Sequence, residues 1–397
     1  MSRASFSARR MQGLSLIELM ISLVIGLIIL LAVVQVFSAS RTAYQLSEGL
    51  ARVQENSRFA MDTLQREIRM AGHFGCTNDQ AHTLESLSTL QSTLDGAANP
   101  GLDFMRSIQG YEATGTEPGK TLTLAATPAT GGTAYTPALP TAISSALTNR
   151  VDGSDIIALR YLMPDGVPIT AIGGTIEKPV YTFEAARWSV LRSGVTNPGL
   201  FGVADCGSAT VFQASAVNAT TGTITFDTVK LNGSRTFSNG YMLGQAMLYR
   251  AESAVYYVGY DATTKQSSLY RVRFGAAPNG DLVASSPEAM VEGVENLQLL
   301  YGQDRSLGAR PSGYIDRQGT AKAVQESLPS DIGLAWRRVG VVQVGLLVSS
   351  PDPAAARQAD SNAALVSMGV TYTAPTDGRM RAVYQTTVAL RNRLFGN

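Results

Sequence analysis

The chain has 397 residues, a formal net charge of +1 and only 16% charged residues. This near-neutral balance argues against nucleic acid as the main partner, because binding to a phosphate backbone calls for a clear excess of lysine and arginine. The length exceeds one average domain and allows a sizeable core. With 38 glycines and few charges, the composition is typical of a β-rich protein outside the cytoplasm.

The first feature along the chain is an apolar segment near the N-terminus. Residues 19–37 form a run of 19 residues interrupted only by Ser22, Gly26 and Gln35. At ~1.5 Å per residue this run spans roughly 28 Å, which is close to the hydrocarbon thickness of a bilayer. Residues 1–13, ahead of it, contain three arginines and no acidic residue. The positive-inside rule therefore places residues 1–13 in the cytoplasm and the chain after about Ser40 on the far side of the membrane.

Glu18 is unusual at the start of such a segment. A secretory signal peptide has a shorter apolar core, normally about 7–15 residues, and an ordinary signal anchor gives the carboxylate no role. Arg9 and Arg10 alone are too little for a twin-arginine export signal. An ionised carboxylate is costly near the bilayer centre, but Glu18 lies close enough to the start of the helix to stay near the headgroups.

Gly13, Leu14 and Glu18 together resemble the class III signal of type IV prepilins, in which a short basic leader ends in glycine and glutamate is the fifth mature residue. The resemblance implies that a prepilin peptidase cuts between Gly13 and Leu14 and methylates the new amine of Leu14, a position where the family usually has phenylalanine. It also implies that Glu18 docks on the charged amine of a neighbouring subunit's first residue, because an unpaired ion inside a dry fibre is strongly unfavourable.

The apolar run continues into a helical pattern. From residue 41 to residue 71 an apolar stripe recurs at spacings of three and four, with polar residues on the other faces. We therefore expect one helix over residues 14–71, ended by Gly72, with residues 14–38 crossing the membrane and the second half packed on a folded domain. The stripe consists of Leu46, Leu50, Val53, Ser57, Ala60, Leu64, Ile68 and Ala71.

Cys76 and Cys206 are the only two cysteines of the chain. If the domain lies in the periplasm, two cysteines suggest a disulfide that ties the end of the helix to the β domain, with two free thiols as the alternative. Metal binding by His73, Cys76 and His82 would lack the usual spacing of zinc ligands. We predict the Cys76–Cys206 disulfide, no metal and no cofactor.

The remaining chain is predicted to contain two regions. Residues 73–150 are predicted to be a loop-rich insertion with a short helix over 83–94 and a short strand at 121–125, and residues 151–397 a β-rich periplasmic domain with one helical turn at 288–292. We expect two sheets, a small one near Cys206 and a larger one from the last four segments. Strands are expected at residues 155–162, 180–184, 187–192, 209–214, 222–227, 246–250, 254–260, 269–274, 297–301, 336–349 and 381–391.

Motifs in the second half of the chain restrict the resemblance from type IV prepilins in general to one type of minor pilin. The helix end at residues 69–76 is followed by VENLQLLYG at 294–302, WRRV at 336–339 and VALRNR at 388–393. In this order the motifs resemble the PilW-type minor pilins, relatives of the J-type minor pseudopilins of type II secretion. The resemblance implies an α+β type IV pilin fold and a complex with other minor pilins that starts pilus assembly and lies at or near the tip. Because the tip-most pseudopilin type lacks the fifth-position glutamate, Glu18 implies a place below the apex.

The implied partners are other minor pilins, the major pilin, the prepilin peptidase, the assembly platform and inner-membrane lipid. The protein would cross the inner membrane once, with its C-terminal domain in the periplasm, before it enters the fibre tip. We find no nucleophile elbow, phosphate-binding loop or calcium loop, and therefore predict no enzyme. The open alternatives are a minor pseudopilin of type II secretion, a tip adhesin that uses residues 77–150, and a membrane-anchored periplasmic hydrolase.

Overall fold

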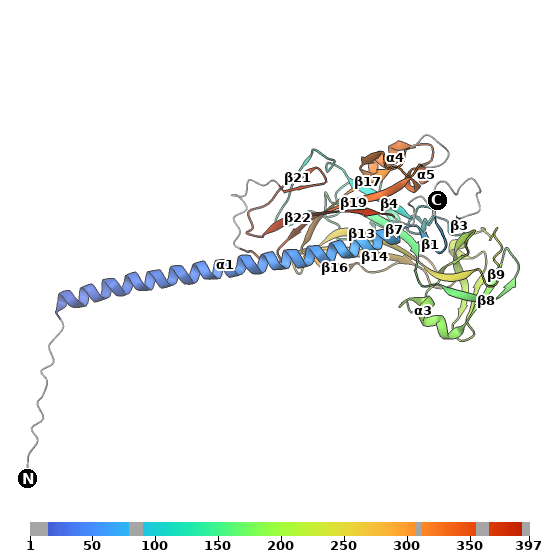
Figure 1. Ribbon diagram of the computed structural model, residues 1–397, viewed down its shortest axis with the longest axis horizontal. Coiled ribbons are helices and arrows are strands. Elements are labelled where there is room, and N and C mark those ends of the chain that lie inside the picture. The colour runs from blue at the N-terminus through green and yellow to red at the C-terminus, as the bar shows by residue number, and fades with distance from the viewer. Residues whose placement is uncertain (1–14, 79–89, 306–311, 355–364, 391–397) are drawn as a thin grey trace, which may run out of the picture.

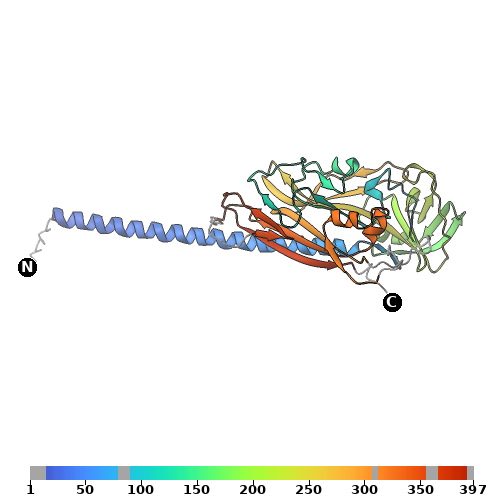
Figure 2. The ribbon, with the colours of Figure 1, turned by 90° about the horizontal axis from the view of Figure 1, so that it is seen from above.

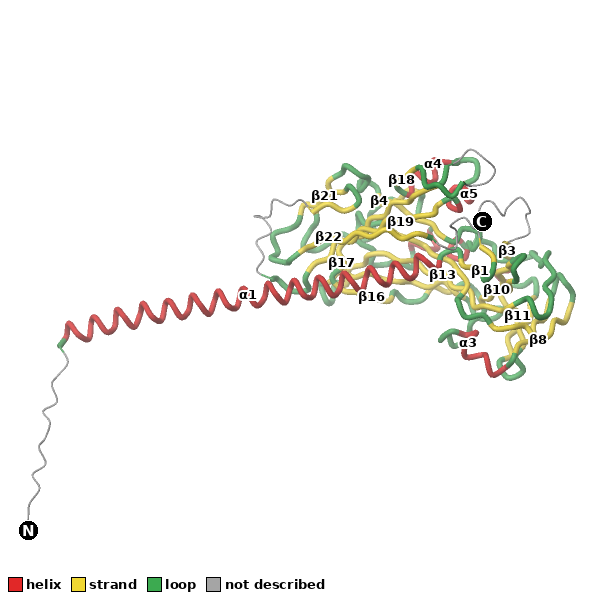
Figure 3. The backbone as a smooth tube through the Cα atoms, viewed as in Figure 1, coloured by secondary structure: helices red, strands yellow, loops and turns green. Residues whose placement is uncertain are grey.

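A computed structural model of the chain describes residues 15–78, 90–305, 312–354 and 365–390. A single long helix, α1 (Leu16–Met70), leads into a domain built mainly of β-strands (Figures 1 and 3). The first half of α1 stands clear of the domain, and the second half lies along it. Helix and β domain together make the α+β, pilin-like architecture expected from the sequence.

The main sheet of the domain is antiparallel, with strand order β6-β4-β7-β13-β14-β16 and β15 beside β14. Its central strand β13 is 15 residues long and pairs with β7 on one edge and β14 on the other. The bounds are β4 (Ile108–Ala113), β6 (Tyr135–Thr136), β7 (Ile156–Leu162), β13 (Met247–Asp261), β14 (Gln266–Gly275), β15 (Val283–Ala284) and β16 (Glu288–Glu292).

A small barrel adjoins one end of this sheet. The first residues of β13 pair with both β8 and β10, so six antiparallel strands close a ring in the order β13-β10-β11-β12-β9-β8. The interior of the ring contains a cluster of aromatic side chains that includes Tyr181, Phe212 and Phe237. The bounds are β8 (Val167–Gly174), β9 (Pro179–Phe183), β10 (Leu200–Ala204), β11 (Ala209–Asn218) and β12 (Thr223–Phe226), with β3 (Leu90–Ser92) beside β11.

A second sheet has the order β18-β17-β19-β22, all antiparallel. Its strands are β17 (Val294–Gln303), β18 (Arg317–Gly319), β19 (Val339–Ser349) and β22 (Arg381–Ala389). Two smaller sheets consist of β5 (Thr121–Thr123), β20 (Leu365–Ser367) and β21 (Val370–Thr373), and of β1 (His73–Phe74) and β2 (Thr77–Asn78). Short helices are α2 (Thr141–Ser144), α3 (Trp188–Arg192), α4 (Ala321–Ser327) and α5 (Ile332–Arg337), with 3-10 turns η2 (Pro100–Leu102), η3 (Ala185–Arg187) and η4 (Lys230–Asn232).

The largest core lies where the second half of α1 meets both sheets. Val53, Leu64 and Ile68 of the helix, fully buried, pack with Leu159 of the main sheet and Leu346 of the second sheet. Seen from above, the helix runs beneath the strands as a continuous rod (Figure 2). The predicted stripe of α1 therefore packs as expected from Val53 onward, because its spacing of three and four turns one face of the helix to the domain. Leu46 and Leu50, near its start, remain exposed.

The expectation of a loop-rich insertion over residues 73–150 needs correction. Strand β4 lies inside that range, is buried along its whole length, and pairs with β7 in the main sheet. The region is therefore partly core, and removing residues 77–150 would take a strand out of the sheet. Most of the predicted helix over 83–94 falls outside the described residues, and its end forms strand β3.

Four further predictions are wrong in detail. Residues 187–192 form a turn and helix α3, because Trp188 stacks on Phe183 and Leu191 is buried in the barrel core. Residues 288–292 form strand β16, and residues 332–337 form helix α5 ahead of β19. The sheet near Cys206 is the larger one, because β13 joins the barrel to the main sheet.

Candidate functional site

The exposed half of α1 is the most distinctive surface of the molecule. Between residues 16 and 37 every large apolar side chain is at least half exposed, from 51% for Ile25 to 77% for Leu16. The helix contains an 18-residue window with a mean hydropathy of 3.0, none of it buried by the domain. An apolar surface of this extent is covered in a functioning protein, either by lipid or by other protein chains.

Glu18 lies in the first turn of α1, at the outer end of this apolar rod. The free N–H groups of a helix start favour a negative charge there. The side chain is exposed and forms no ion pair with any described residue, while its backbone carbonyl accepts a hydrogen bond from Ser22 Oγ at 2.7 Å. Gly13 and Leu14, the predicted cleavage and methylation residues, lie outside the described residues. Glu18 is thus available to an external partner.

Gly49 marks the point where α1 meets the domain. It is the first buried residue along the described helix, and a Cβ built on it would lie 2.7 Å from Cβ of Ala354. The loop after β19 therefore packs directly against the helix backbone, which only glycine permits at this distance. The sequence pattern marks Gly49 as a poor helix former, but its partner on the loop becomes visible only in the folded chain.

The end of α1 is fixed by a turn and a covalent bond. The helix ends at Met70, and Gly72 follows with φ of +77°, the left-handed conformation that suits glycine. The predicted disulfide is present: Cys76 and Cys206 are bonded with their Cα atoms 4.7 Å apart. Cys206 belongs to the turn between β10 and β11, so the bond joins the helix end to the barrel. The prediction that Gly72 ends the helix and the predicted Cys76–Cys206 disulfide are both confirmed.

A hydrogen-bonded seam joins the two large sheets. Just before β7, the backbone N–H of Asp155 donates to the carbonyl of Leu297 in β17 at 2.9 Å. The Asp155 carboxylate accepts from the N–H groups of Ala113 in β4 and Leu299 in β17, both at 2.9 Å. One buried side chain therefore ties together three strands, two from the main sheet and one from the second sheet.

A second buried carboxylate lies close to this seam. Glu112 of β4 is only 3% exposed, and burial together with the nearby Asp155 raises its pKa to about 9. Burial also raises the pKa of Asp155 to about 7. The hydroxyl of Tyr301, fully buried nearby, has no hydrogen-bond partner among the described residues. No pattern in the local sequence indicates that these two carboxyls are buried.

Arg160 is a third buried polar residue that the sequence pattern did not reveal. It lies in β7 and is fully buried. Its guanidinium donates to three carbonyls of the segment before β4: Nη2 to Pro100 and Nη1 to Arg106 at 2.7 Å each, and Nε to Gly101 at 3.3 Å. Its own backbone carbonyl accepts from Gly72 N at 3.4 Å. Arg160 therefore links the end of α1, β7 and the loop beside them.

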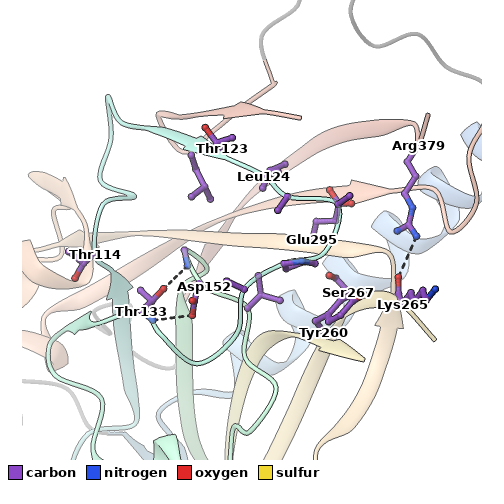
Figure 4. Close-up of a pocket in the computed structure, with 17 residues that line it drawn as sticks. Thr114, Thr123, Leu124, Thr133, Asp152, Tyr260, Lys265, Ser267, Glu295 and Arg379 are labelled. Atoms are coloured by element: carbon purple, nitrogen blue, oxygen red, sulfur yellow. Dashed lines mark hydrogen bonds between the residues drawn. The ribbon is translucent and has the colours of Figure 1, made fainter. Parts of the chain in front are cut away.

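A cavity of about 270 Å³ lies between the segment that follows β5 and the turn from β13 to β14 (Figure 4). Its charged groups already serve the fold. Asp152 accepts hydrogen bonds from the N–H groups of Gly132 and Thr133, and Arg379 donates to the carbonyl of Lys265. Its described lining includes no histidine or cysteine, and the described ranges contain no group of three or more side chains suited to a metal ion. The cavity offers no recognisable reaction centre.

Two family models match the chain. The model described as "Prokaryotic N-terminal methylation motif" matches residues 8–34, and that described as "Type IV Pilus-assembly protein W" (PilW) matches residues 255–392, about a third of the chain. The second match covers the second sheet and the end of the main sheet, while strands β8 to β12 of the barrel lie outside both matches. In comparisons with curated proteins and with solved structures, nothing matches the chain. With a methylation motif on the exposed apolar helix and a pilus-assembly match on the β domain, the chain is similar in these two regions to PilW-type minor pilins of the type IV pilus.

Proposed function

We propose that this chain is a PilW-type minor pilin that helps to start pilus assembly and enters the fibre at or near its tip, together with other minor pilins. The role is structural and non-enzymatic. The observation that carries the proposal is the fully exposed apolar half of α1, which the chain's own domain leaves uncovered. Such a helix is stable first in the lipid of the inner membrane, with the domain in the periplasm, and later among the helices of a fibre.

The proposal includes the processing of the N-terminus. A prepilin peptidase cuts between Gly13 and Leu14 and methylates Leu14, which makes Glu18 the fifth residue of the mature chain. In the fibre the Glu18 carboxylate pairs with the N-terminal amine of a neighbouring subunit. This pairing is favourable because both charges would otherwise be buried without a partner.

The position of the barrel in the molecule supports a position of this subunit near the pilus tip. The barrel lies beyond the C-terminal end of α1, on the side away from the membrane (Figure 1). In a fibre whose subunits all point their N-termini toward the membrane, the next subunit would have to occupy that space. A subunit with such an extension fits more easily where few subunits lie between it and the pilus tip.

The mass of the N-terminal peptide tests the processing step. We expect protein isolated from membranes or from sheared pili to begin at Leu14 with one added methyl group on its amine. An N-terminus at Met1, or one near Arg41 as after a signal-peptide cut, would contradict the proposal.

Replacing Glu18 with alanine tests the docking role. We expect normal membrane insertion but loss of co-isolation with the other minor pilins, because the neighbour's amine would be left buried and unpaired. Breaking such a pair costs about 3–5 kcal/mol, which corresponds to roughly a hundredfold or more in affinity. Glu48→Ala, the same change on an exposed part of α1 outside the apolar half, serves as the control. Equal recovery of the partners with both variants would remove the docking role.

A further inference from the structure

The second sheet ends in a long strand whose outer edge is open. Strand β22 pairs with β19 through nine consecutive residue pairs without a bulge. Within the described part of the chain, no strand pairs with its other edge. Figure 2 shows this red strand at the margin of the domain, beside the blue helix.

The direction of its hydrogen bonds follows from one contact. The N–H of Leu390 donates to the carbonyl of Gly340, next to β19, at 2.9 Å. Because backbone groups alternate along a regular strand, the even-numbered residues of β22 turn their N–H and carbonyl groups toward β19. Val383, Gln385, Thr387 and Ala389 then turn theirs toward the open edge.

Several other strand edges of the described fold are protected in ways that β22 is not. Strands β5, β18 and β20 have three residues each and β6 has two, while β16 has glutamates at both ends and an irregular register. Short length, charge and irregularity are the usual means of preventing strand addition. The only charged residue of β22 is Arg381 at its start, which is held by Glu295 and Asp377. The open edge is therefore long, regular and uncharged.

A groove lies over one face of the second sheet, where Leu300, Gln343 and Thr387 form a row across β17, β19 and β22. It has a volume of about 570 Å³, with Gln343, Gln385 and Thr387 among the residues that line it. The hairpin of β20 and β21 supplies apolar side chains of its wall, including Val366 and Met368. A strand added to an open edge gains affinity from its backbone and specificity from pockets that receive alternate side chains. The open edge supplies backbone groups, and the end of the groove lined by Gln385 and Thr387 can receive side chains of an added strand.

We propose that β22 accepts a β-strand from a different pilin-type subunit, which extends the second sheet across the subunit boundary. This inference rests on the proposed function, since that function supplies a neighbouring subunit. A second copy of the same chain fits poorly, because β22 runs along α1 (Figures 1 and 2). Antiparallel pairing of two copies would point their helices in opposite directions, and parallel pairing would place the helices on opposite faces of the joined sheet.

The test uses a cross-link from the open edge in the full chain. Both native cysteines are in the disulfide, so Gln385→Cys introduces one free thiol at an exposed position. In membranes we expect this thiol, carrying a short photoactivatable cross-linker, to join to a strand of another protein with a methylated prepilin N-terminus. Adding Thr387→Pro removes an edge N–H and should lower the yield at least about tenfold, whereas Thr387→Val should leave it unchanged.

A second variant that should prevent strand addition, and a comparison with Glu18→Ala, complete the test. Thr387→Lys places a charge at the edge without altering the backbone and should give the same loss as proline, even if the proline variant folds poorly. Cross-links only to a second copy, or a yield unaffected by the lysine variant, would overturn strand addition. If Glu18→Ala abolishes assembly while the lysine variant does not, the assembly role stands and the strand proposal alone fails.

Discussion

Replacing Arg160 with methionine is expected to lower the free energy of unfolding by about 2–5 kcal/mol, the cost of leaving backbone carbonyls inside the domain without a donor. Methionine keeps most of the apolar stem but removes the donors to the carbonyls of Pro100, Gly101 and Arg106. The carbonyl of Gly101 keeps a hydrogen bond from Ser253 Oγ, so the loss falls mainly on the carbonyls of Pro100 and Arg106, and each unsatisfied group costs free energy. Urea unfolding of the detergent-solubilised chain, followed by circular dichroism, measures the loss.

Two further variants separate this network from a general effect of losing an arginine. Arg160→Lys keeps one charge but not the planar fork that reaches three carbonyls, so an intermediate loss is expected. Arg187→Met removes an exposed arginine and should change the free energy by no more than about 0.5 kcal/mol. If Arg160→Met and Arg187→Met had equal effects, the three hydrogen bonds would contribute nothing to stability.

The stability of the domain should fall as the pH rises from 6 to 8, by about 2–4 kcal/mol. Burial raises the pKa of Glu112 to about 9 and that of Asp155 to about 7, whereas in the unfolded chain both are ordinary carboxyls. Between the unfolded and folded pKa values the folded chain holds more protons than the unfolded chain. The protonated carboxyls of Glu112 and Asp155 therefore add to the stability of the fold at pH 6. This contribution is lost as the pH rises through the folded pKa values.

Glu112→Gln isolates the contribution of this carboxyl. The amide has the shape of the protonated acid and cannot ionise, so the variant should lose about half or more of the pH slope and be more stable than the native chain at pH 8. Glu177→Gln, an exposed residue on the turn between β8 and β9, should leave the slope unchanged. Urea unfolding at pH 6, 7 and 8 gives the slopes. An unaltered slope in Glu112→Gln would mean that this carboxyl is already ionised in the fold.

The features predicted well from the sequence are those set by neighbouring residues. The apolar run, the periodic stripe and Gly72 together predict α1 to within two residues at its described start and one at its end. Runs of β-branched and aromatic residues predict β7, β9, β12 and β14 closely. The pairing of Cys76 with Cys206 follows from there being only two cysteines in a chain expected outside the cytoplasm.

The features that were missed depend on contacts between distant parts of the chain. Residues 187–192 have strand-like composition, but Trp188 and Leu191 are held as a helix by the barrel core. The barrel itself closes because one half of β13 meets β8 and β10, pairings that no local pattern encodes. The buried positions of Glu112, Asp155 and Arg160 are equally invisible in the sequence, where each is one more charged residue.

The sequence by itself determined the long apolar helix, its carboxylate and the resemblance to PilW-type minor pilins, because an apolar helix and a processing motif are properties of a continuous segment. Only the tertiary structure decided where the helix meets the domain, which acids are buried and which strand edge is left open. Burial and strand pairing are set by residues that lie far apart along the chain and come together only when it folds.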